Sequence, residues 1–318
     1  MDKAPTSLKT FVIIVTFNGM RYIDRCLKSV LASSIPLQII IIDNHSTDQT
    51  IAKIENNYLT PKLILIKQVQ NLGFGKANNL GLKYALTQNA DYVFLLNQDA
   101  YLEPDTIKNL IYASQHNPKF GVLSPIQISV AHDYKQQSSL HSQARQISPV
   151  KFMPAAMWLL PTAVIKKIGC FDPSFFHYGE DNDYLNRVRF HGFKIGICHS
   201  AVGYHANQGR NFSPQQELYL DYIEYKQTVK NLNLNLFVTI IHAGLKSCHR
   251  SFLYFIALRF KMMFLTLSKY LLVLKNFPQI IKERKASRQV GAYLRQNFDI
   301  IFFELLIFFN SILNNTIN

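Results

Sequence analysis

Two acidic residues of this 318-residue chain, Asp43 and Asp99, each belong to a polar run that follows a short apolar segment. Asp43 begins the run Asp-Asn-His-Ser-Thr-Asp. A carboxylate at the end of a strand can accept hydrogen bonds from a ribose hydroxyl or from the N3–H of a uracil or thymine ring. The alternative is that Asp43 and Asp48 only cap the helix that follows.

Asp99 closes the run Asn97-Gln98-Asp99 and could hold Mg²⁺ or Mn²⁺ through hard oxygen ligands, bridging a diphosphate and stabilising its charge as it leaves. A plain loop aspartate is the alternative.

Residues 71–79 form a glycine-bearing loop that enters a helix, and such a loop lets backbone N–H groups approach an anion. The loop is neither a GxGxxG nor a P-loop, so neither ATP nor NAD is implied.

The first half of the chain alternates short apolar runs with amphipathic segments, which is typical of βαβ units around a mainly parallel sheet. Thr16, Asp43 and Asp99 then follow separate strands at the carboxyl edge, where open α/β sheets bind ligands. The pattern predicts strands at 11–15, 38–42, 63–67 and 92–96, and helices at 22–33, 49–57 and 75–88, the first with Ile23, Leu27, Val30 and Leu31 on one face.

The chain resembles the family 2 glycosyltransferases of the GT-A fold, particularly bacterial rhamnosyltransferase-like members, over roughly residues 11–210. The resemblance lies in five ordered motifs: VTFNG, IIIDNHSTDQT, NLGFGKANN, FLLNQDA and FFHYGEDNDYLNRVRFHGFKI. It implies an α/β fold with a Rossmann-like, mixed, mainly parallel sheet flanked by helices. It also implies an inverting, metal-dependent glycosyltransferase that uses a nucleotide-diphosphate sugar.

The resemblance assigns most of the donor site by position. Thr16 and Asn18 match the first-strand motif that lines the nucleotide pocket, and Asp43 matches the carboxylate that contacts the base or ribose. Asp99 matches the last acid of the DxD metal motif. The first acid of that motif is replaced here by Asn97, which removes one negative charge, so metal affinity is expected to be weak without the donor diphosphate. The loop that borders the donor corresponds to Asn71, Gly73, Phe74 and Asn78.

The resemblance also implies a catalytic base. Glu180 and Asp181 match the ED motif, in which the aspartate takes the proton from the acceptor hydroxyl, and inverting transfer needs a carboxylate across the sugar from the leaving diphosphate. The alternative is that Glu180, Asp181 and Asp183 only favour the positive end of a helix, and Asp183 is interpreted as structural. His205 stands where similar enzymes place a metal-binding or diphosphate-facing histidine.

The acceptor site is expected around Glu180, His177, Tyr178 and Trp158. An aromatic ring suits the apolar face of a sugar, although a tryptophan in the core is equally compatible with the sequence. The donor favoured by resemblance is dTDP-rhamnose, with a UDP-sugar as the other nucleotide class. The expected acceptor is a glycan or lipid-linked glycan of cell-surface polysaccharide synthesis.

The net charge of +14 is concentrated near the C-terminus, where the residues from Lys226 onward carry 13 Lys and Arg against three acids. Basic residues interleaved with apolar runs suit an anionic membrane surface better than nucleic acid, which is not an expected partner. Segment 252–274 contains three cations, each costing roughly 2.5–3.5 kcal/mol at a bilayer centre, and 298–313 is too short to span. Both are predicted to lie in the interface, with Lys275, Lys282, Arg284, Lys285 and Arg288 near lipid phosphates.

The predicted division is a GT-A domain at 1–227 and a basic, apolar, helical membrane-associating region at 228–318. The alternative for the second region is an ordinary helical subdomain with a basic surface. The sequence shows no signal peptide, so we expect a cytoplasmic protein attached peripherally to the inner face of the cell membrane. Segment 131–148 is polar and predicts a mobile loop, and Cys26, Cys170, Cys198 and Cys248 have no metal-binding spacing and are expected to be reduced core thiols.

Two rival functions follow from other interpretations. A nucleotidyltransferase also combines an α/β sheet with metal-bound phosphates, but it would be expected to carry a basic glycine-rich signature near the first strand, where the first cation is Arg21. The second rival is a membrane-bound, non-catalytic sugar-binding relic of a transferase. Such a relic would bind a donor tightly without turning it over.

Overall fold

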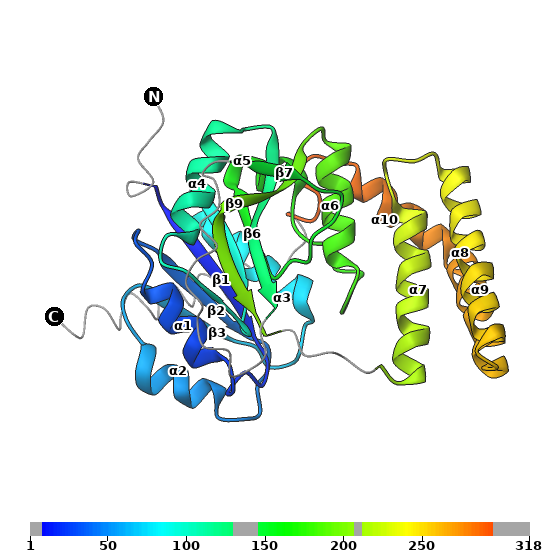
Figure 1. The fold of residues 1–318 in the computed structure, drawn as a ribbon, viewed down its shortest axis with the longest axis horizontal. Helices are drawn as coiled ribbons and strands as arrows, with labels where there is room; N and C mark the ends of the chain where they lie inside the picture. The colour runs from blue at the N-terminus through cyan, green and yellow to red at the C-terminus, as the bar shows by residue number, and fades with distance from the viewer. Residues whose placement is uncertain (1–7, 130–145, 207–211, 295–318) are drawn as a thin grey trace.

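The computed structural model describes residues 8–129, 146–206 and 212–294. A mixed sheet with helices on both faces forms the body of the molecule, and a group of helices stands to one side of it (Figure 1). The predicted loop at 131–148 lies outside the described residues except for its last three, of which Ile147 and Ser148 begin a short strand. The predicted interfacial segment 298–313 also lies outside them.

The nine-stranded sheet has the order β3-β2-β1-β4-β8-β6-β9-β5, with β7 paired to β9. The first four strands are parallel, β8 runs antiparallel to β4 and β6, and β6 and β9 are parallel, which confirms the mixed, mainly parallel sheet. The strands are β1 (Thr10–Thr16), β2 (Gln38–Asp43), β3 (Leu63–Lys67), β4 (Tyr92–Asn97), β5 (Ala100–Leu102), β6 (Phe120–Ser129), β7 (Ile147–Pro149), β8 (Met157–Pro161) and β9 (Lys194–His205).

The register of the strands gathers the polar runs at one edge of the sheet. Thr16 pairs with Asp43, and Val15 pairs with Asn97. The last residue of β9, His205, pairs with Ala100, directly after the Asn97-Gln98-Asp99 turn. Motifs that are distant along the chain therefore end side by side.

Alternate side chains of each buried strand face opposite layers of helices, as the two-residue period of a strand requires. One layer consists of α3 (Phe74–Thr87), α5 (Thr162–Ile168) and α6 (Glu180–Phe190), whose apolar residues pack with Ile13 of β1. The other consists of α1 (Ile23–Leu31), α2 (Thr50–Tyr58) and α4 (Thr106–His116), which pack with Val12 and Ile14. The sheet edge that carries the polar runs is held between two apolar layers.

Two sequence-based predictions about burial are wrong. Leu31 is 48% exposed because it is the last residue of α1 and Cys26 completes the buried face with Ile23, Leu27 and Val30. Three of the four cysteines are buried as predicted, but Cys248 is exposed on α8 (Leu236–Ile256).

Beyond the sheet, α7 (Pro214–Lys230), α8 and α9 (Phe260–Lys275) pack against one another, and α10 (Phe277–Ser287) leads back to the body (Figure 1). The segment after α10 docks at the end of α5, where Ala292 accepts a hydrogen bond from the Cys170 N–H at 2.9 Å. The predicted boundary after residue 227 falls inside α7. No helix in the described part of the chain combines the length and apolar character needed to cross a membrane.

Candidate active site

A cavity of about 370 Å³ opens at the sheet edge where the polar runs meet. Its lining comes from the ends of β1, β2 and β4, from the loop that enters α3, and from the loop that precedes α6. Four of the five sequence motifs thus contribute, and so does the start of the fifth. The lining residues are Val15, Phe17, Asn44, Asn71, Gly73, Phe74, Asn97, Gln98, Asp99, Phe176 and His177.

One wall of the cavity is the loop between β3 and α3, which is hydrogen-bonded to Asn44 at the end of β2. The Asn44 side-chain amide donates to Asn71 Oδ1 at 2.8 Å, and Asn44 Oδ1 accepts from the Leu72 N–H at 2.8 Å. Gly73 has a φ of +79°, and a Cβ there would lie 2.0 Å from the carbonyl oxygen of Phe176. Only glycine fits both the backbone conformation and the close approach, so this position shapes the wall.

Another part of the lining is set by Gln98. Its Oε1 accepts from Thr16 Oγ1 at 2.7 Å and from the Phe17 N–H at 3.0 Å, and its Nε2 donates to the Phe17 carbonyl at 3.1 Å. Thr16 itself is fully buried, so it supports Gln98 and does not face the cavity. The sequence interpretation placed Thr16 in the nucleotide pocket. In the structure Thr16 lies behind the cavity lining and orients Gln98, which lines it.

The predicted metal residues lie together. His205 Nε2 is 3.1 Å from Asp99 Oδ1, and Asn97 Nδ2 is 3.4 Å from the same ring nitrogen. Within the described residues no group of three or more His, Cys, Asp or Glu side chains could hold an ion. Two protein ligands nevertheless fit Mg²⁺ or Mn²⁺, because such ions are commonly held by one or two side chains together with substrate phosphates.

Asp43 is fully buried at the end of β2. Its Oδ2 accepts from the Ser46 N–H at 3.0 Å, whereas its Oδ1 has no hydrogen-bond partner among the described residues. Asp48, and not Asp43, accepts from the N–H of Thr50, the first residue of α2. The capping alternative therefore fits Asp48, and the unpaired oxygen of Asp43 is the kind of group that a ligand N–H or hydroxyl would satisfy.

The loops after β1 and β2 are bonded to each other beside Asp43. Asn18, with a φ of +48°, accepts from the Thr47 N–H at 2.8 Å and donates its own N–H to Ser46 Oγ at 2.9 Å. Because Asp43 has no exposed surface, a donor base can reach it only when these loops separate. Asn18 is thus placed to join the two loops, and its contact with a donor stays a prediction.

The sequence assignments of Trp158 and Asn78 to ligand contacts are contradicted by burial. Trp158 lies on β8 with no exposed surface, and its ring stacks on Phe171 at 6.2 Å and packs against Tyr184 at 5.9 Å between ring centroids. Asn78 is 1% exposed and donates to the Phe74 carbonyl one turn earlier in α3. Trp158 belongs to the core, as its alternative interpretation allowed, and Asn78 stabilises the start of a helix.

The first turn of α6 carries Glu180 and Asp181. Gly179, with a φ of +95°, lets the chain turn into the helix. Asp181 is partly buried and accepts a hydrogen bond from the Asn182 N–H at 2.7 Å, and burial raises the pKa of Asp181. A raised pKa makes this carboxylate a stronger base than an exposed aspartate, as general base catalysis requires.

The same turn adjoins the rim of the cavity. Phe176 and His177 line the cavity a few residues before α6 begins, and a Cβ built on Gly75 of α3 would lie 3.4 Å from Glu180 Cβ. Tyr178 has a φ of +65° and packs on His177, with ring centroids 4.2 Å apart. The start of α3 and the loop before α6 therefore form one side of the cavity, and the first turn of α6 packs beside α3.

Glu180 has an unusual environment, because it is 7% exposed and its Oε2 has no partner among the described residues. Burial, and next the charge of Asp181, raise the pKa of Glu180 to about 8 from 4.5. A carboxyl whose folded pKa is raised contributes stability that is fully present below the unfolded pKa and lost as the pH rises through the folded value.

We therefore expect Glu180→Gln to gain stability over the wild type as the pH rises from about 4.5 to about 8, reaching about 1–3 kcal/mol. Urea unfolding across this pH range measures the difference. Glu55→Gln, at a half-exposed surface position paired with Lys67, is the control and should show no such trend. A constant difference at all pH values would show that Glu180 is charged in the folded protein.

A second cavity of about 620 Å³ is lined in part by His205. Its polar lining includes Gln127 of β6 and the pair Ser148 and His199, whose side chains are 2.8 Å apart. No motif pointed to these residues, because they lie on strands outside the motifs. Asn44 and Gln98 were also missed, although each stands beside an assigned acid within a motif.

The sequence matches the model of glycosyl transferase family 2 over residues 11–169. The low-salt glycan biosynthesis hexosyltransferase Agl10 of Haloferax volcanii is 24% identical over 171 residues, which are 48% of this chain and 55% of the relative. The poly(ribitol-phosphate) beta-N-acetylglucosaminyltransferase TarS of Staphylococcus aureus is 23% identical over 255 residues, which are 76% of this chain and 42% of the relative. The chain thus spans about half the length of these two curated relatives.

An N-acetylglucosaminyl-diphospho-decaprenol L-rhamnosyltransferase of Mycobacterium tuberculosis is 26% identical over 214 residues, covering 56% of this chain and 69% of the relative. Among solved structures, residues 1–349 of S. aureus TarS in complex with UDP-GlcNAc superpose with a TM-score of 0.58 at 19% identity, covering 89% of this chain and 84% of that one. This likeness confirms the expected GT-A fold. With the family model matching half of its length and the five motifs gathered at one sheet edge, the chain belongs to glycosyl transferase family 2.

Proposed function

We propose that the chain is an inverting, metal-dependent glycosyltransferase that moves a sugar from a nucleoside-diphosphate donor to an acceptor hydroxyl. The observation that supports this most strongly is the cavity in which the Asn71 loop, the Asp99 and His205 pair and the rim before α6 meet. Asp99 borders the cavity, Asp181 lies in the first turn of the helix beside its rim, and Asp43 lies at the same edge of the sheet.

In this proposal Asp181 removes the proton from the acceptor hydroxyl as its oxygen attacks the anomeric carbon of the sugar. The bond from that carbon to the diphosphate oxygen breaks, its electron pair leaves with the nucleoside diphosphate, and the configuration inverts. Asp99 and His205 would hold a divalent ion, which would neutralise negative charge on the diphosphate. The Asn71 loop lines the donor side, and Asn71 Oδ1 holds its shape by accepting from the Asn44 amide and the Gly73 N–H.

The relatives support a donor and acceptor class. Their names include a rhamnosyltransferase acting on N-acetylglucosaminyl-diphospho-decaprenol and an N-acetylglucosaminyltransferase acting on poly(ribitol-phosphate). We favour a dTDP-linked rhamnose donor, with a UDP-sugar as the other class. The acceptor in this proposal is a glycan or lipid-linked glycan of the cell surface.

A panel of nucleotide-sugars tests the proposal. With Mn²⁺ present, one dTDP- or UDP-sugar should raise the unfolding temperature and release free nucleoside diphosphate slowly through hydrolysis of the donor. Release of pyrophosphate from a nucleoside triphosphate and a sugar phosphate would instead indicate a nucleotidyltransferase. Protection by a donor without turnover on any acceptor would indicate the sugar-binding relic.

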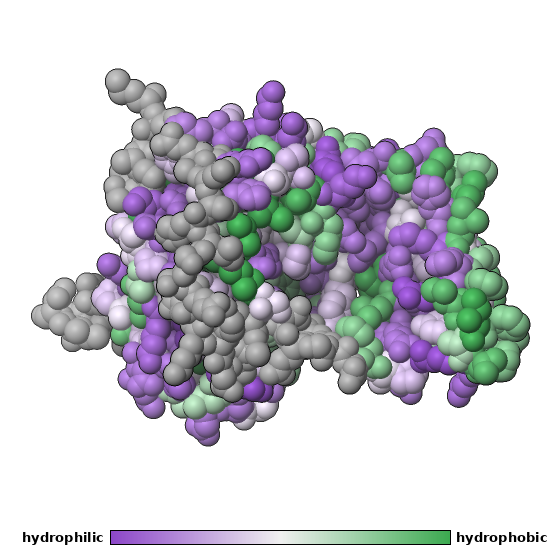
Figure 2. All heavy atoms as spheres, in the orientation of Figure 1, coloured by the Kyte–Doolittle hydropathy of each residue, from purple (hydrophilic) through white to green (hydrophobic). Residues whose placement is uncertain are grey.

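We also propose that α8 and α9 bind the cytoplasmic face of an anionic membrane. Figure 2 shows apolar surface over these two helices. Lys261, Lys275, Lys282, Lys285 and Arg288 are exposed on the helical region and suit anionic headgroups. The exposed apolar side chains of these helices include Phe237, Leu245, Phe252, Phe255, Ile256, Phe260, Phe264 and Leu271.

Not all of the predicted basic surface is available to lipid. Arg284 is 3% exposed and donates to the carbonyls of Val229, Asn231 and Leu234, so it stabilises the end of α7. The expectation that Arg284 lies near lipid phosphates is therefore wrong, because backbone oxygens at a helix end already take up its hydrogen bonds.

We expect the chain to bind phosphatidylcholine vesicles that contain phosphatidylglycerol about tenfold or more tightly than pure phosphatidylcholine vesicles, and to dissociate as salt is raised. Sedimentation with vesicles measures this. Phe252→Ser with Phe264→Ser should weaken binding, because both rings are more than half exposed. Equal partition to neutral vesicles would contradict the electrostatic part, and self-association relieved by these substitutions would indicate a protein interface instead.

A further inference from the structure

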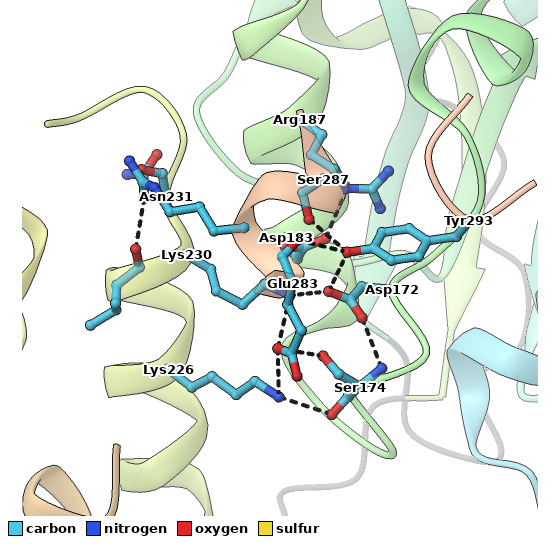
Figure 3. A network of polar contacts seen from close by, with 12 residues as sticks. Asp172, Ser174, Asp183, Arg187, Lys226, Lys230, Asn231, Glu283, Ser287 and Tyr293 are labelled. Carbon is cyan, nitrogen blue, oxygen red and sulfur yellow. Dashed lines mark hydrogen bonds and ion pairs between the residues drawn. The ribbon is translucent and has the colours of Figure 1, made fainter. Parts of the chain in front are cut away.

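A buried ionic cluster joins α6 to α7 and α10 (Figure 3). Lys230 of α7 is 1% exposed at its side chain and forms an ion pair with Asp172. It also lies 3.4 Å from Glu283 of α10 and 3.9 Å from Asp183 of α6. Lys226, one turn earlier, lies 3.2 Å from Glu283. The two lysines in the last turns of α7 therefore face inward toward the α/β body.

The cluster fixes the inner side of α6. Asp183 accepts from Arg187 Nε at 2.9 Å, and the other two nitrogens of Arg187 donate to the carbonyls of Ile168 and Cys170 at 2.9 and 2.8 Å. Each of the five donors of a buried guanidinium is costly to leave unpaired, so this arrangement holds α6 firmly. The interpretation of Asp183 as structural agrees with these contacts.

A second set of contacts from α7 reaches the first turn of α6. The Asn182 side-chain amide donates to Gln227 Oε1 at 3.0 Å. A Cβ at Gly179 would lie 2.3 Å from Gln227 Nε2, so the helix approaches the turn closely there. Tyr219 donates its hydroxyl to the His177 carbonyl at 3.0 Å. Helix α7 thus contacts the chain on both sides of Asp181.

The position of Asp181 depends on its backbone. Its carboxylate accepts a hydrogen bond from the N–H of the next residue, Asn182, and the two residues before the helix have φ values of +65° and +95°. A turn of this kind is held in place by the elements packed against it. A displacement of about 1 Å at a reacting group can cost about 100-fold in rate.

We propose that α7 is a positioning element for the candidate base, with Gln227 acting through Asn182 and Tyr219 acting through the His177 carbonyl. The inference rests on the proposed transferase function for the role of Asp181. Through these contacts the helical region contributes to the catalytic face as well as to the proposed membrane surface. We accordingly place the division between the two regions after α7 and not at residue 227.

A double-substitution experiment tests the contact. Gln227→Leu and Asn182→Ala should each lower kcat about tenfold with little change in KM, measured with the nucleotide-sugar that raises the unfolding temperature. The double variant should lose no more rate than either single variant, because both substitutions remove the same hydrogen bond. Gln227→Glu keeps an acceptor oxygen for Asn182 and should recover most of the rate. Gln215→Ala, at an exposed position of the same helix, is the matched control. Losses that multiply in the double variant, or an equal loss in the control, would overturn the proposal.

Amide hydrogen exchange provides a readout that does not need turnover. Exchange across residues 178–186 should become faster in Gln227→Leu, return toward wild type in Gln227→Glu and stay unchanged in Gln215→Ala. Unchanged exchange in Gln227→Leu would overturn the positioning role even if the wild type transfers sugar. Faster exchange in a chain that turns over no donor would support the contact and reject only the transferase function.

Discussion

Replacing Asp181 with asparagine should lower turnover by about 10²–10⁴-fold while nucleotide binding and stability stay near wild type. Asparagine keeps the size of the side chain and can still accept from the Asn182 N–H, but it cannot take a proton at neutral pH. The donor cavity is lined by other residues, so the KM for the donor should change little. Steady-state kinetics and the unfolding temperature of the variant measure the two effects separately.

Asp183→Asn is the matched control for this prediction. Asp183 lies two residues further along the same helix, but it is 3% exposed and paired with Arg187. Its substitution should therefore lower stability through the unpaired guanidinium, and any loss of rate should follow the loss of folded protein. Undiminished turnover in Asp181→Asn would place the base elsewhere.

Lys230→Met should lower the free energy of unfolding by about 3–5 kcal/mol, because it removes the cation from a buried ion pair and leaves Asp172 and Glu283 without it. Methionine keeps the apolar length of the side chain, so the loss reports mainly on charge. Urea unfolding at pH 7 gives the value. Lys246→Met removes an exposed pair with Glu224 and should cost less than about 1 kcal/mol.

The pH dependence of this effect has a definite sign. Burial alone would raise the pKa of Asp172, but the neighbouring charge of Lys230 outweighs it and lowers the pKa from 3.8 to about 2. A lowered folded pKa gives stability that is present above the unfolded value and lost as the pH falls through the folded value. The difference between wild type and Lys230→Met should therefore shrink as the pH falls below about 4 toward 2. Equal small losses for Lys230→Met and Lys246→Met at pH 7 would contradict the buried cluster.

The sheet and its polar edge could be predicted from the sequence because each strand is a short, β-branched apolar run with a polar run at its end. Because these strands are parallel neighbours, their carboxyl ends bring Thr16, Asp43 and Asn97 to one edge of the sheet. The contact between Asp99 and His205 was implied by resemblance, and the structure explains it through the pairing of β5 with β9. Residue type alone did not separate cavity from core for Trp158 and Asn78, since an aromatic ring or an amide suits either place.

The packing of the C-terminal helices could not be predicted, because it depends on ion pairs between residues far apart in the sequence. Lys230 meets Asp172 across 58 positions, and Arg284 reaches backbone carbonyls 50 to 55 positions away. In the sequence these cations only added to a basic tail, which favoured a membrane interpretation for all of them. The structure divides the basic residues into two groups. Buried ones join α7 and α10 to α6 through ion pairs, and exposed ones can contact an anionic surface.

The proposed function depends most on one nucleoside diphosphate and one metal ion meeting at the carboxyl edge of the sheet. A crystal structure with Mn²⁺ and whichever of UDP or dTDP protects the protein tests this directly, since the anomalous signal of manganese locates the ion. We expect manganese between Asp99 and His205, the base beside Asp43 and the diphosphate facing the first turn of α6. Manganese or nucleotide bound at another face of the molecule, with the Asp99 cavity empty, would contradict it.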